Sequence, residues 1–250
     1  MALKNIAHRG APRLAPENTL AAFERALALG VDGVELDVHR SSDGHAMVMH
    51  DRLLNRTTNG KGPIDHQPAR DLRALDAGAH FAPGFAGERI PFLAEVLDLM
   101  KGKGEVQVEL KGLSPGLPEE VVRLIEERGM IDQAVVTSFV HTLVRAVREL
   151  NPRFQTGILL APDARPRTDD TLWYEEIEGF AFAARAGTVL PHHSVATKGL
   201  FDHLSGQGLL PGAWTVDDPD EIRRMAAIGA TRMTSNVPDL VNRLLGGATR

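Results

Sequence analysis

Acidic and apolar residues alternate in the segment Val34-Glu35-Leu36-Asp37. Alternate side chains of a β-strand point to the same face, so we expect Glu35 and Asp37 to lie side by side. Neighbouring carboxylates repel each other, and in a buried strand the pair is costly unless a cation or a proton lies between them. Two interpretations follow: the pair holds a cation, or it lies at a solvent-exposed edge or end of its strand.

A second alternating segment, residues 106–111, ends in an acid and a base that share one face. Glu109 thereby supplies a third carboxylate. The chain has no cysteine, which excludes a thiolate site, and carboxylate oxygens suit hard divalent ions. Glu35, Asp37 and Glu109 therefore predict a site for Mg²⁺ or Ca²⁺. Lys111 either neutralises an anionic group of the substrate or is a solvent-exposed residue at the end of its strand.

Further polar residues follow predicted strands directly. His8 and Arg9 come after the first strand, and His50 comes after a short extended piece, residues 46–49. The planar guanidinium of Arg9 suits a phosphate group, and two histidines with near-neutral pKa can act as base and acid in one cycle. Trp214 ends a later strand, where it either lines a pocket or belongs to the core. The other histidines are interpreted as surface or structural residues.

These residues need a scaffold that brings the ends of separate strands together. Short apolar runs alternate with amphipathic segments along the whole chain, which is the pattern of repeated βα units around a parallel sheet. Eight such runs predict a closed (β/α)8 TIM barrel, an α/β fold in which residues 1–250 form one domain. The predicted strands are residues 3–7, 33–38, 105–110, 134–137, 154–159, 179–183, 210–215 and 231–234.

Helices between the strands are indicated by apolar residues spaced three and four apart. Pro16 and Asn18 mark the start of the first helix and Gly30 marks its end. The stretch between His50 and Pro91 is too long for an ordinary βα connection. We therefore expect a small insertion after the second strand, approximately residues 51–90, over the mouth of the barrel.

Composition narrows the class of function. Of the 250 residues, 43% are hydrophobic and 24% are charged, as in ordinary globular domains. A net charge of −5 gives no reason to expect nucleic acid binding, and no apolar run approaches the roughly 20 residues of a transmembrane segment. Residues 1–7 are too short an apolar run for a signal peptide, so cytoplasmic residence is the default. A small soluble substrate fits best, and the oligomeric state stays open.

Taken together, these motifs resemble the ordered signature of the glycerophosphodiester phosphodiesterase family, in its bacterial, cytosolic form. The resemblance spans nearly the whole chain and is densest before Asp65. One position departs from it: Asn236 stands where the commoner Thr-Asp-x-Pro pattern has an aspartate. The matching motifs are His8-Arg9-Gly10, Pro16-Glu17-Asn18-Thr19, Glu35-Leu36-Asp37-Val38, His50-Asp51, Arg56-Thr57-Thr58-Asn59-Gly60, Glu109-Leu110-Lys111 and Trp214-Thr215-Val216.

The resemblance implies a (β/α)8 barrel and metal-dependent hydrolysis of glycerophosphodiesters, such as glycerophosphocholine or glycerophosphoethanolamine, to sn-glycerol 3-phosphate and an alcohol. It makes Glu35, Asp37 and Glu109 the metal ligands. It makes His8 and His50 the general acid and base in either order, with water or the glycerol 2-hydroxyl as nucleophile. The substrate contacts that it implies are Arg9, Lys111 and Trp214.

Two other functions are compatible with the same barrel. A lysophospholipase D would hydrolyse lysophospholipids at this site and would need an apolar groove for an acyl chain. Residues in or beside the predicted insertion could line such a groove or simply pack it on the barrel: Leu72, Leu75, Phe81, Phe85 and Phe92. A non-catalytic phosphate-binding module is the third candidate, although such a module is expected to have lost a histidine or a carboxylate.

Overall fold

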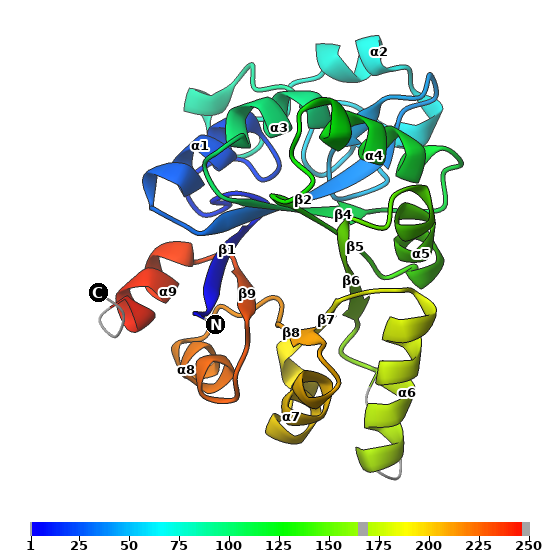
Figure 1. Cartoon of the computed structure of the whole chain (residues 1–250). Helices are drawn as coiled ribbons and strands as arrows, with labels where there is room; N and C mark the ends of the chain where they lie inside the picture. The colour runs from blue at the N-terminus through cyan, green and yellow to red at the C-terminus, as the bar shows by residue number, and fades with distance from the viewer. Residues whose placement is uncertain (1, 165–169, 247–250) are drawn as a thin grey trace.

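The structure is a computed structural model that describes residues 2–164 and 170–246. Eight parallel strands in these residues form a nearly closed barrel with helices around it (Figure 1), which confirms the predicted (β/α)8 fold. The parallel strands are β1 (Lys4–His8), β2 (Gly33–Arg40), β4 (Glu105–Leu110), β5 (Ala134–Ser138), β6 (Gln155–Leu160), β7 (Thr188–Pro191), β8 (Leu210–Pro211) and β9 (Arg232–Ser235).

The strand order closes the sheet on itself. Neighbouring strands follow the order β8-β7-β6-β5-β4-β2-β1-β9, and β3 (Ala46–Val48) pairs antiparallel with β2. The two end strands meet where a parallel bridge joins Ala213 to Met233. All eight strands of the barrel therefore end at the same rim, where side chains from distant parts of the sequence can meet.

The outer helices follow from apolar residues on one face. In α4, for example, Val121, Leu124 and Ile125 are buried at the predicted helical spacing. In α1 the cap is Thr19, whose side chain accepts a hydrogen bond from the backbone of Ala22. The helices around the barrel are α1 (Leu20–Ala28), α3 (Leu93–Met100), α4 (Leu117–Glu127), α5 (His141–Leu150), α6 (Asp170–Ala183), α7 (Lys198–Gly206), α8 (Pro219–Ala227) and α9 (Pro238–Leu245).

Alternation in β2 sorts its side chains between two environments. Val34, Leu36 and Val38 are fully buried and belong to the apolar cluster beneath the helices. Burying each of these side chains stabilises the fold by about 1.5–3 kcal/mol. Because alternate residues face opposite sides, Glu35 and Asp37 must then point into the barrel. The apolar layer thus determines where the acids lie.

The segment between β3 and α3 contains the short helices η1 (Ile64–His66), α2 (Ala69–Ala74) and η2 (Pro83–Phe85). In Figure 1, α2 lies outside the ring of barrel helices. The segment has its own apolar cluster, in which Ile64 and Leu72 are fully buried and against which Leu75 and Phe92 pack. Three of the five residues considered for an acyl-chain groove are thus packing residues of this segment.

One predicted strand is wrong. Residues 179–183 form the end of α6, and the sixth barrel strand is β7, a few residues later. The alternation of phenylalanine and alanine imitates a strand, but the buried residues Trp173, Ile177 and Ala181 are four apart, which is a helical period. Phe180 and Phe182 face outward and are partly exposed.

The predicted strand 210–215 is also longer than the observed one. β8 ends at Pro211. Ala213 and Trp214 join their neighbours only through isolated bridges. Among the described helices, none is long and apolar enough to cross a membrane.

Candidate active site

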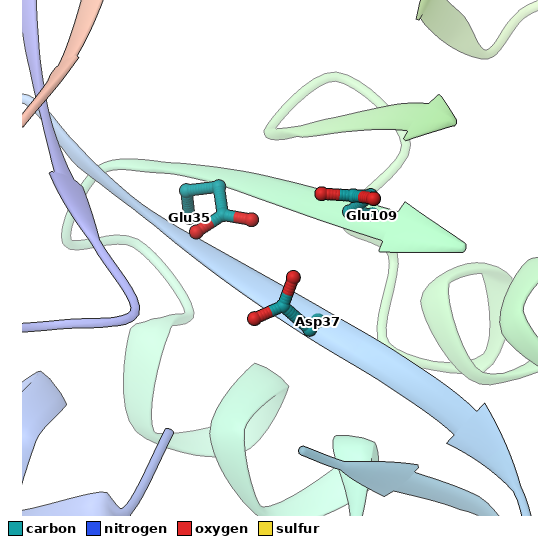
Figure 2. Close-up of side chains that lie close together, drawn as sticks. All are labelled: Glu35, Asp37 and Glu109. Atoms are coloured by element: carbon teal, nitrogen blue, oxygen red, sulfur yellow. The ribbon is translucent and has the colours of Figure 1, made fainter. Parts of the chain in front are cut away.

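Three carboxylates meet inside the barrel near the carboxyl ends of its strands. Glu35 and Asp37 come from β2 and Glu109 comes from β4 (Figure 2). Asp37 and Glu109 are direct partners in the parallel register, and Glu35 is the partner of His8. One oxygen of each carboxylate lies within 4.8 Å of the others. The structure thus brings together the three acids that the sequence predicted as a metal site.

This cluster is buried, with exposed fractions of 4% for Glu35, 0% for Asp37 and 7% for Glu109. Asp37 Oδ1 and Glu109 Oε1 have Lys111 Nζ as their partner, in ion pairs at 3.1 and 2.5 Å, and each oxygen keeps a further lone pair. Buried oxygens with free lone pairs in an all-carboxylate set are suited to a hard divalent cation. The residues present therefore fit a metal ion.

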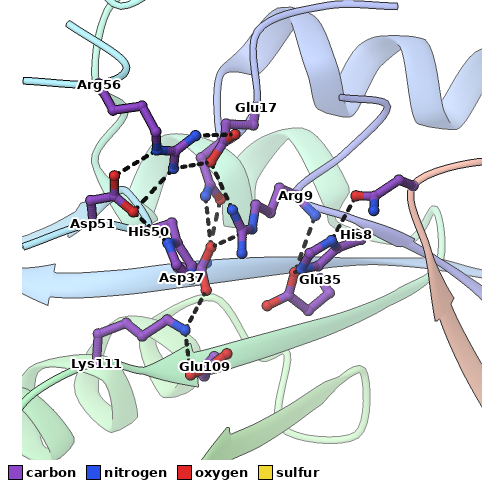
Figure 3. Close-up of polar contacts among 12 residues, drawn as sticks. His8, Arg9, Glu17, Glu35, Asp37, His50, Asp51, Arg56, Glu109 and Lys111 are labelled. Atoms are coloured by element: carbon purple, nitrogen blue, oxygen red, sulfur yellow. Dashed lines mark hydrogen bonds and ion pairs between the residues drawn. The ribbon is translucent and has the colours of Figure 1, made fainter. Parts of the chain in front are cut away.

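Arg9 and Lys111 lie beside Asp37 (Figure 3), and the amide of Asn18 contacts the same carboxylate. Arg9 Nε lies 3.2 Å from Asp37 Oδ2, and Asn18 Nδ2 donates a hydrogen bond of 2.8 Å to the same oxygen. Lys111 lies between Asp37 and Glu109. Arg9 and Lys111, predicted as phosphate contacts, therefore lie beside the carboxylates, where they partly compensate the negative charge.

Burial and like charges shift the pKa values of the acids in different directions. Burial, and then the charges of Asp37 and Glu109, raise the pKa of Glu35 well above its usual range. Burial and the charge of Asp37 raise the pKa of Glu109 to about 7. Burial opposes ionisation of Asp37 too, but Lys111 and Arg9 outweigh it and hold its pKa below the usual range. Three adjacent carboxylates thus favour a bound proton or an added cation.

His8 ends β1 beside this cluster, with Nε2 3.8 Å from Glu35 Oε2. On its other side, Nδ1 lies 2.7 Å from Asn236 Oδ1. The Asn236 amide is oriented by Asp217, whose Oδ2 accepts from Asn236 Nδ2 at 2.7 Å. Since Asn236 Oδ1 can only accept, His8 Nδ1 carries a proton and Nε2 has a free lone pair in the neutral ring. Burial, with a smaller effect of Arg9, lowers the pKa of His8 to about 4.

His50 has a carboxylate as its partner. Its Nδ1 lies 2.7 Å from Asp51 Oδ1, and Arg56 holds Asp51 through Nε at 2.6 Å. Arg56 also donates to Glu17, which in turn accepts from Arg9 Nη1 at 2.9 Å (Figure 3). One polar network therefore connects His50 to Arg9 across the mouth of the barrel.

An aromatic group lies on another side of the site. Trp214 stacks edge-on against Phe139 and His192, with ring centroids 5.2 and 5.1 Å apart, and its Nε1 donates to Leu190 O. Lys111 Nζ lies 5.8 Å from the centre of the Phe139 ring. Trp214 is only partly buried, and through Phe139 it extends the wall of the site beyond Lys111.

The sequence matches a known protein family over most of its length. Residues 8–240 match the sequence model of the glycerophosphoryl diester phosphodiesterase family. The chain belongs to this family. It is 35% identical over 243 residues to a glycerophosphodiester phosphodiesterase of Caldanaerobacter subterraneus subsp. tengcongensis, with 95% of this chain and 96% of the relative covered. It is 30% identical over 259 residues to the Bacillus subtilis glycerophosphodiester phosphodiesterase, with 97% and 86% covered.

Solved structures of the family superpose on most of the chain. A crystal structure from Silicibacter pomeroyi, described as a putative glycerophosphoryl diester phosphodiesterase, has a TM-score of 0.86 at 26% identity and covers 98% and 94% of the two chains. An Oleispira antarctica phosphodiesterase in complex with the product sn-glycerol-3-phosphate has a TM-score of 0.82 at 27% identity, with 96% of each chain covered. The predicted enzyme class, a phosphoric diester hydrolase, is confirmed.

Several residues that support the site in this family member were not predicted as site residues. Asn18 was interpreted as marking the start of a helix, but the side chain that caps α1 is that of Thr19, and Asn18 binds Asp37. Glu17 binds Arg9 and Arg56. The place of Glu17 and Asn18 in a motif shared with the family was the available signal. Nothing in the local sequence indicated that Asn236 would contact His8.

Proposed function

We propose that this chain hydrolyses small glycerophosphodiesters to sn-glycerol 3-phosphate and an alcohol, with a divalent ion held by Glu35, Asp37 and Glu109. The observation that carries the proposal is the buried triad of carboxylates with two histidines and two cations around it at the carboxyl ends of the strands. The Oleispira antarctica relative binds sn-glycerol-3-phosphate as its product, which supports the same product here.

Binding of the phosphodiester would use the cations. Arg9 offers a planar guanidinium and Lys111 a compact ammonium, and both lie next to Asp37, within reach of an anion at the metal. When bound, the metal supplies Lewis-acid polarisation of the phosphoryl oxygens. Trp214 and Phe139 form the wall against which we expect the carbon skeleton of the substrate to pack.

Proton transfer would involve the two histidines. His8 and His50 each use Nδ1 for a fixed partner, which leaves Nε2 of each ring for the reacting atoms. One histidine would accept the proton of the nucleophile, and the other would protonate the leaving alkoxide, because an alcohol leaves poorly without a proton. Their different partners, an amide for His8 and a carboxylate for His50, give the two rings different proton affinities.

The first test is release of sn-glycerol 3-phosphate from glycerophosphocholine and from glycerophosphoethanolamine, with Mg²⁺ or Ca²⁺ and then with EDTA. We expect release from both substrates and loss of turnover on chelation. Hydrolysis of lysophosphatidylcholine without hydrolysis of either small diester would overturn the substrate assignment. Turnover that survives EDTA would overturn the metal assignment.

A binding measurement tests the metal site without turnover. Calorimetric titration of the metal-free protein with Mg²⁺ and Ca²⁺ is expected to show one binding event that Asp37→Asn abolishes. Glu24→Gln is the matched control, because Glu24 is an exposed glutamate on α1 away from the cluster. Equal binding by the wild type and the Asp37 variant would place the ion elsewhere.

A further inference from the structure

A second cavity lies at the opposite end of the barrel from the active site. Its volume is about 1100 Å³, and it is lined by residues at the first positions of several strands, including Lys4 of β1, Thr188 of β7 and Arg232 of β9. Because the barrel strands are parallel, their first residues lie at the rim opposite to His8 and Glu109, which come at strand ends. The cavity shares no lining residue with the catalytic cluster.

This cavity is strongly basic, although the chain carries a net charge of −5. Asp32 is the one acid among the described residues that line it, and its Oδ2 accepts from the backbone N–H of Asn5. A cavity lined mainly by positively charged side chains focuses a positive potential and concentrates anions. Five cationic residues line it: Lys4, Arg148, Arg153, Arg185 and Arg232.

The cations at the cavity are not all used in the fold. Within residues 2–164 and 170–246, the side chains of Arg153 and Arg185 make no hydrogen bond or ion pair, and both residues are exposed. Arg232 is buried by contrast, with an exposed fraction of 3%, and its guanidinium already pairs with Glu105, 3.3 Å from Nε, and donates from Nη1 to Thr188. Among the described residues that line the cavity, Arg153 and Arg185 therefore offer guanidinium donors that the fold does not use.

Apolar side chains complete the wall. Phe182 is 51% exposed and lines the cavity together with Leu210, which is partly buried. The volume is slightly above the range of about 300–1,000 Å³ that is usual for small-molecule sites and is far larger than an inorganic anion needs. Cationic forks next to aromatic surface suit a molecule that has a phosphate group and an apolar or ring portion.

We propose that this cavity is a second, non-catalytic site that binds a small organic phosphate. The phosphate group contacts the guanidinium groups of Arg153 and Arg185, and the organic portion packs on Phe182 and Leu210. The site does not depend on the proposed hydrolysis, because it uses residues at the other end of the barrel.

The test is calorimetric titration of the metal-free full-length protein with phenyl phosphate, a monoester with one aromatic ring, and with inorganic phosphate. We expect Arg153→Gln/Arg185→Gln to weaken phenyl phosphate binding by about tenfold or more, since two charge-assisted contacts are lost. The control is Arg70→Gln/Arg223→Gln, which removes two exposed arginines elsewhere and should leave binding unchanged. Hydrolysis of glycerophosphocholine should be the same in all three proteins.

Phe182→Ala tests the apolar part of the site separately from its phosphate-binding part. This exposed residue can be truncated without a core cavity, and we expect weaker binding of phenyl phosphate with unchanged binding of inorganic phosphate. The proposal is overturned if the Arg153/Arg185 variant binds phenyl phosphate as tightly as the wild type, which would place the anion at the catalytic end. It is also overturned if inorganic phosphate and phenyl phosphate bind equally.

Discussion

At the scale of single residues, the two histidines differ in the groups that hold them. Asn236 departs from the commoner aspartate of the family pattern, yet its amide still binds His8, and the carboxylate of Asp217 lies one contact further away. A neutral partner adds no charge to favour the imidazolium form of His8. His50 has the carboxylate of Asp51 in direct contact.

Replacing either histidine tests its proposed role. We expect His8→Asn and His50→Asn each to lower kcat by about 10²–10⁴-fold, the usual contribution of a general acid or base, with a smaller change in KM. His66→Asn is the control, because His66 is an exposed histidine in η1. Steady-state kinetics at saturating metal measure the effect. A variant that folds and turns over at the wild-type rate removes that histidine from the mechanism.

At the scale of elements, the loop between β1 and α1 positions Arg9 and Glu17. Gly10 has a φ of +87°, and a Cβ at this position would lie 2.6 Å from the backbone carbon of Ala22. Gly30, after α1, has a φ of +69° with open space around the Cβ position. Both glycines thus have a positive φ, but only at Gly10 would an added Cβ clash with a neighbouring helix.

This difference predicts unequal effects of alanine. Gly30→Ala is expected to lower the free energy of unfolding by about 1 kcal/mol, from backbone strain alone. Gly10→Ala must also displace α1 and should cost on the order of 3 kcal/mol and reduce kcat, because Arg9 adjoins it. Urea unfolding and turnover of the two variants test this. Equal losses of stability would show that the contact with Ala22 is not limiting.

A second element-scale contact joins α8 to the loop after β7. Glu221 accepts from Arg224 and from His193 Nδ1, and these contacts, Arg224 first, lower its pKa to about 2. A depressed pKa means that the contact stabilises the fold above the ordinary value of 4.5 and loses this effect as the pH falls towards about 2.

Glu221→Gln should therefore destabilise the protein in a pH-dependent way. We expect a loss of about 1 kcal/mol at pH 7, kept modest by solvent screening, and a progressively smaller loss from pH 4.5 downward. Urea midpoints of wild type and variant at pH 7 and pH 3 measure it, with Glu24→Gln as the control. A difference that stays constant with pH would contradict the electrostatic explanation.

At the scale of the whole molecule, the barrel is tied together across its interior. Glu105 of β4 pairs with Lys4 of β1 at 2.7 Å and with Arg232 of β9 at 3.3 Å, while Arg232 Nη1 donates to Thr188 of β7. These strands meet only when the sheet has closed. The network therefore forms only in the closed barrel and stabilises it.

Replacing Arg232 alone should lower the free energy of unfolding more than replacing Arg232 and Glu105 together. Arg232→Met leaves the buried Glu105 with Lys4 alone and is expected to cost about 3 kcal/mol or more. Glu105→Gln/Arg232→Met removes both buried charges and should be more stable than the single Arg232 variant. Urea unfolding of the wild type, both single variants and the double variant forms the cycle. A double variant less stable than Arg232→Met would contradict this account.

Much of the molecule could be predicted from local pattern. Alternation in β2 and β4 indicated both the strands and the facing of Glu35, Asp37 and Glu109, since one rule governs burial and side-chain direction. The prediction of a strand at residues 179–183 was wrong. Apolar residues alternate there, but the segment ends a helix whose buried residues are four apart. The domain bounds, with an insertion near residues 51–90, and cytoplasmic residence stay predictions.

The sequence by itself therefore determined the family, the repeated βα pattern of the fold and which residue types follow its strands, because residue type and periodicity are local properties. Only the tertiary structure decided the partners of those residues. Asn236 lies at the other end of the chain from His8, and Arg56 reaches Glu17 from a segment beyond β3. Such contacts depend on closure of the barrel and on the path of its loops, and no local pattern encodes either one.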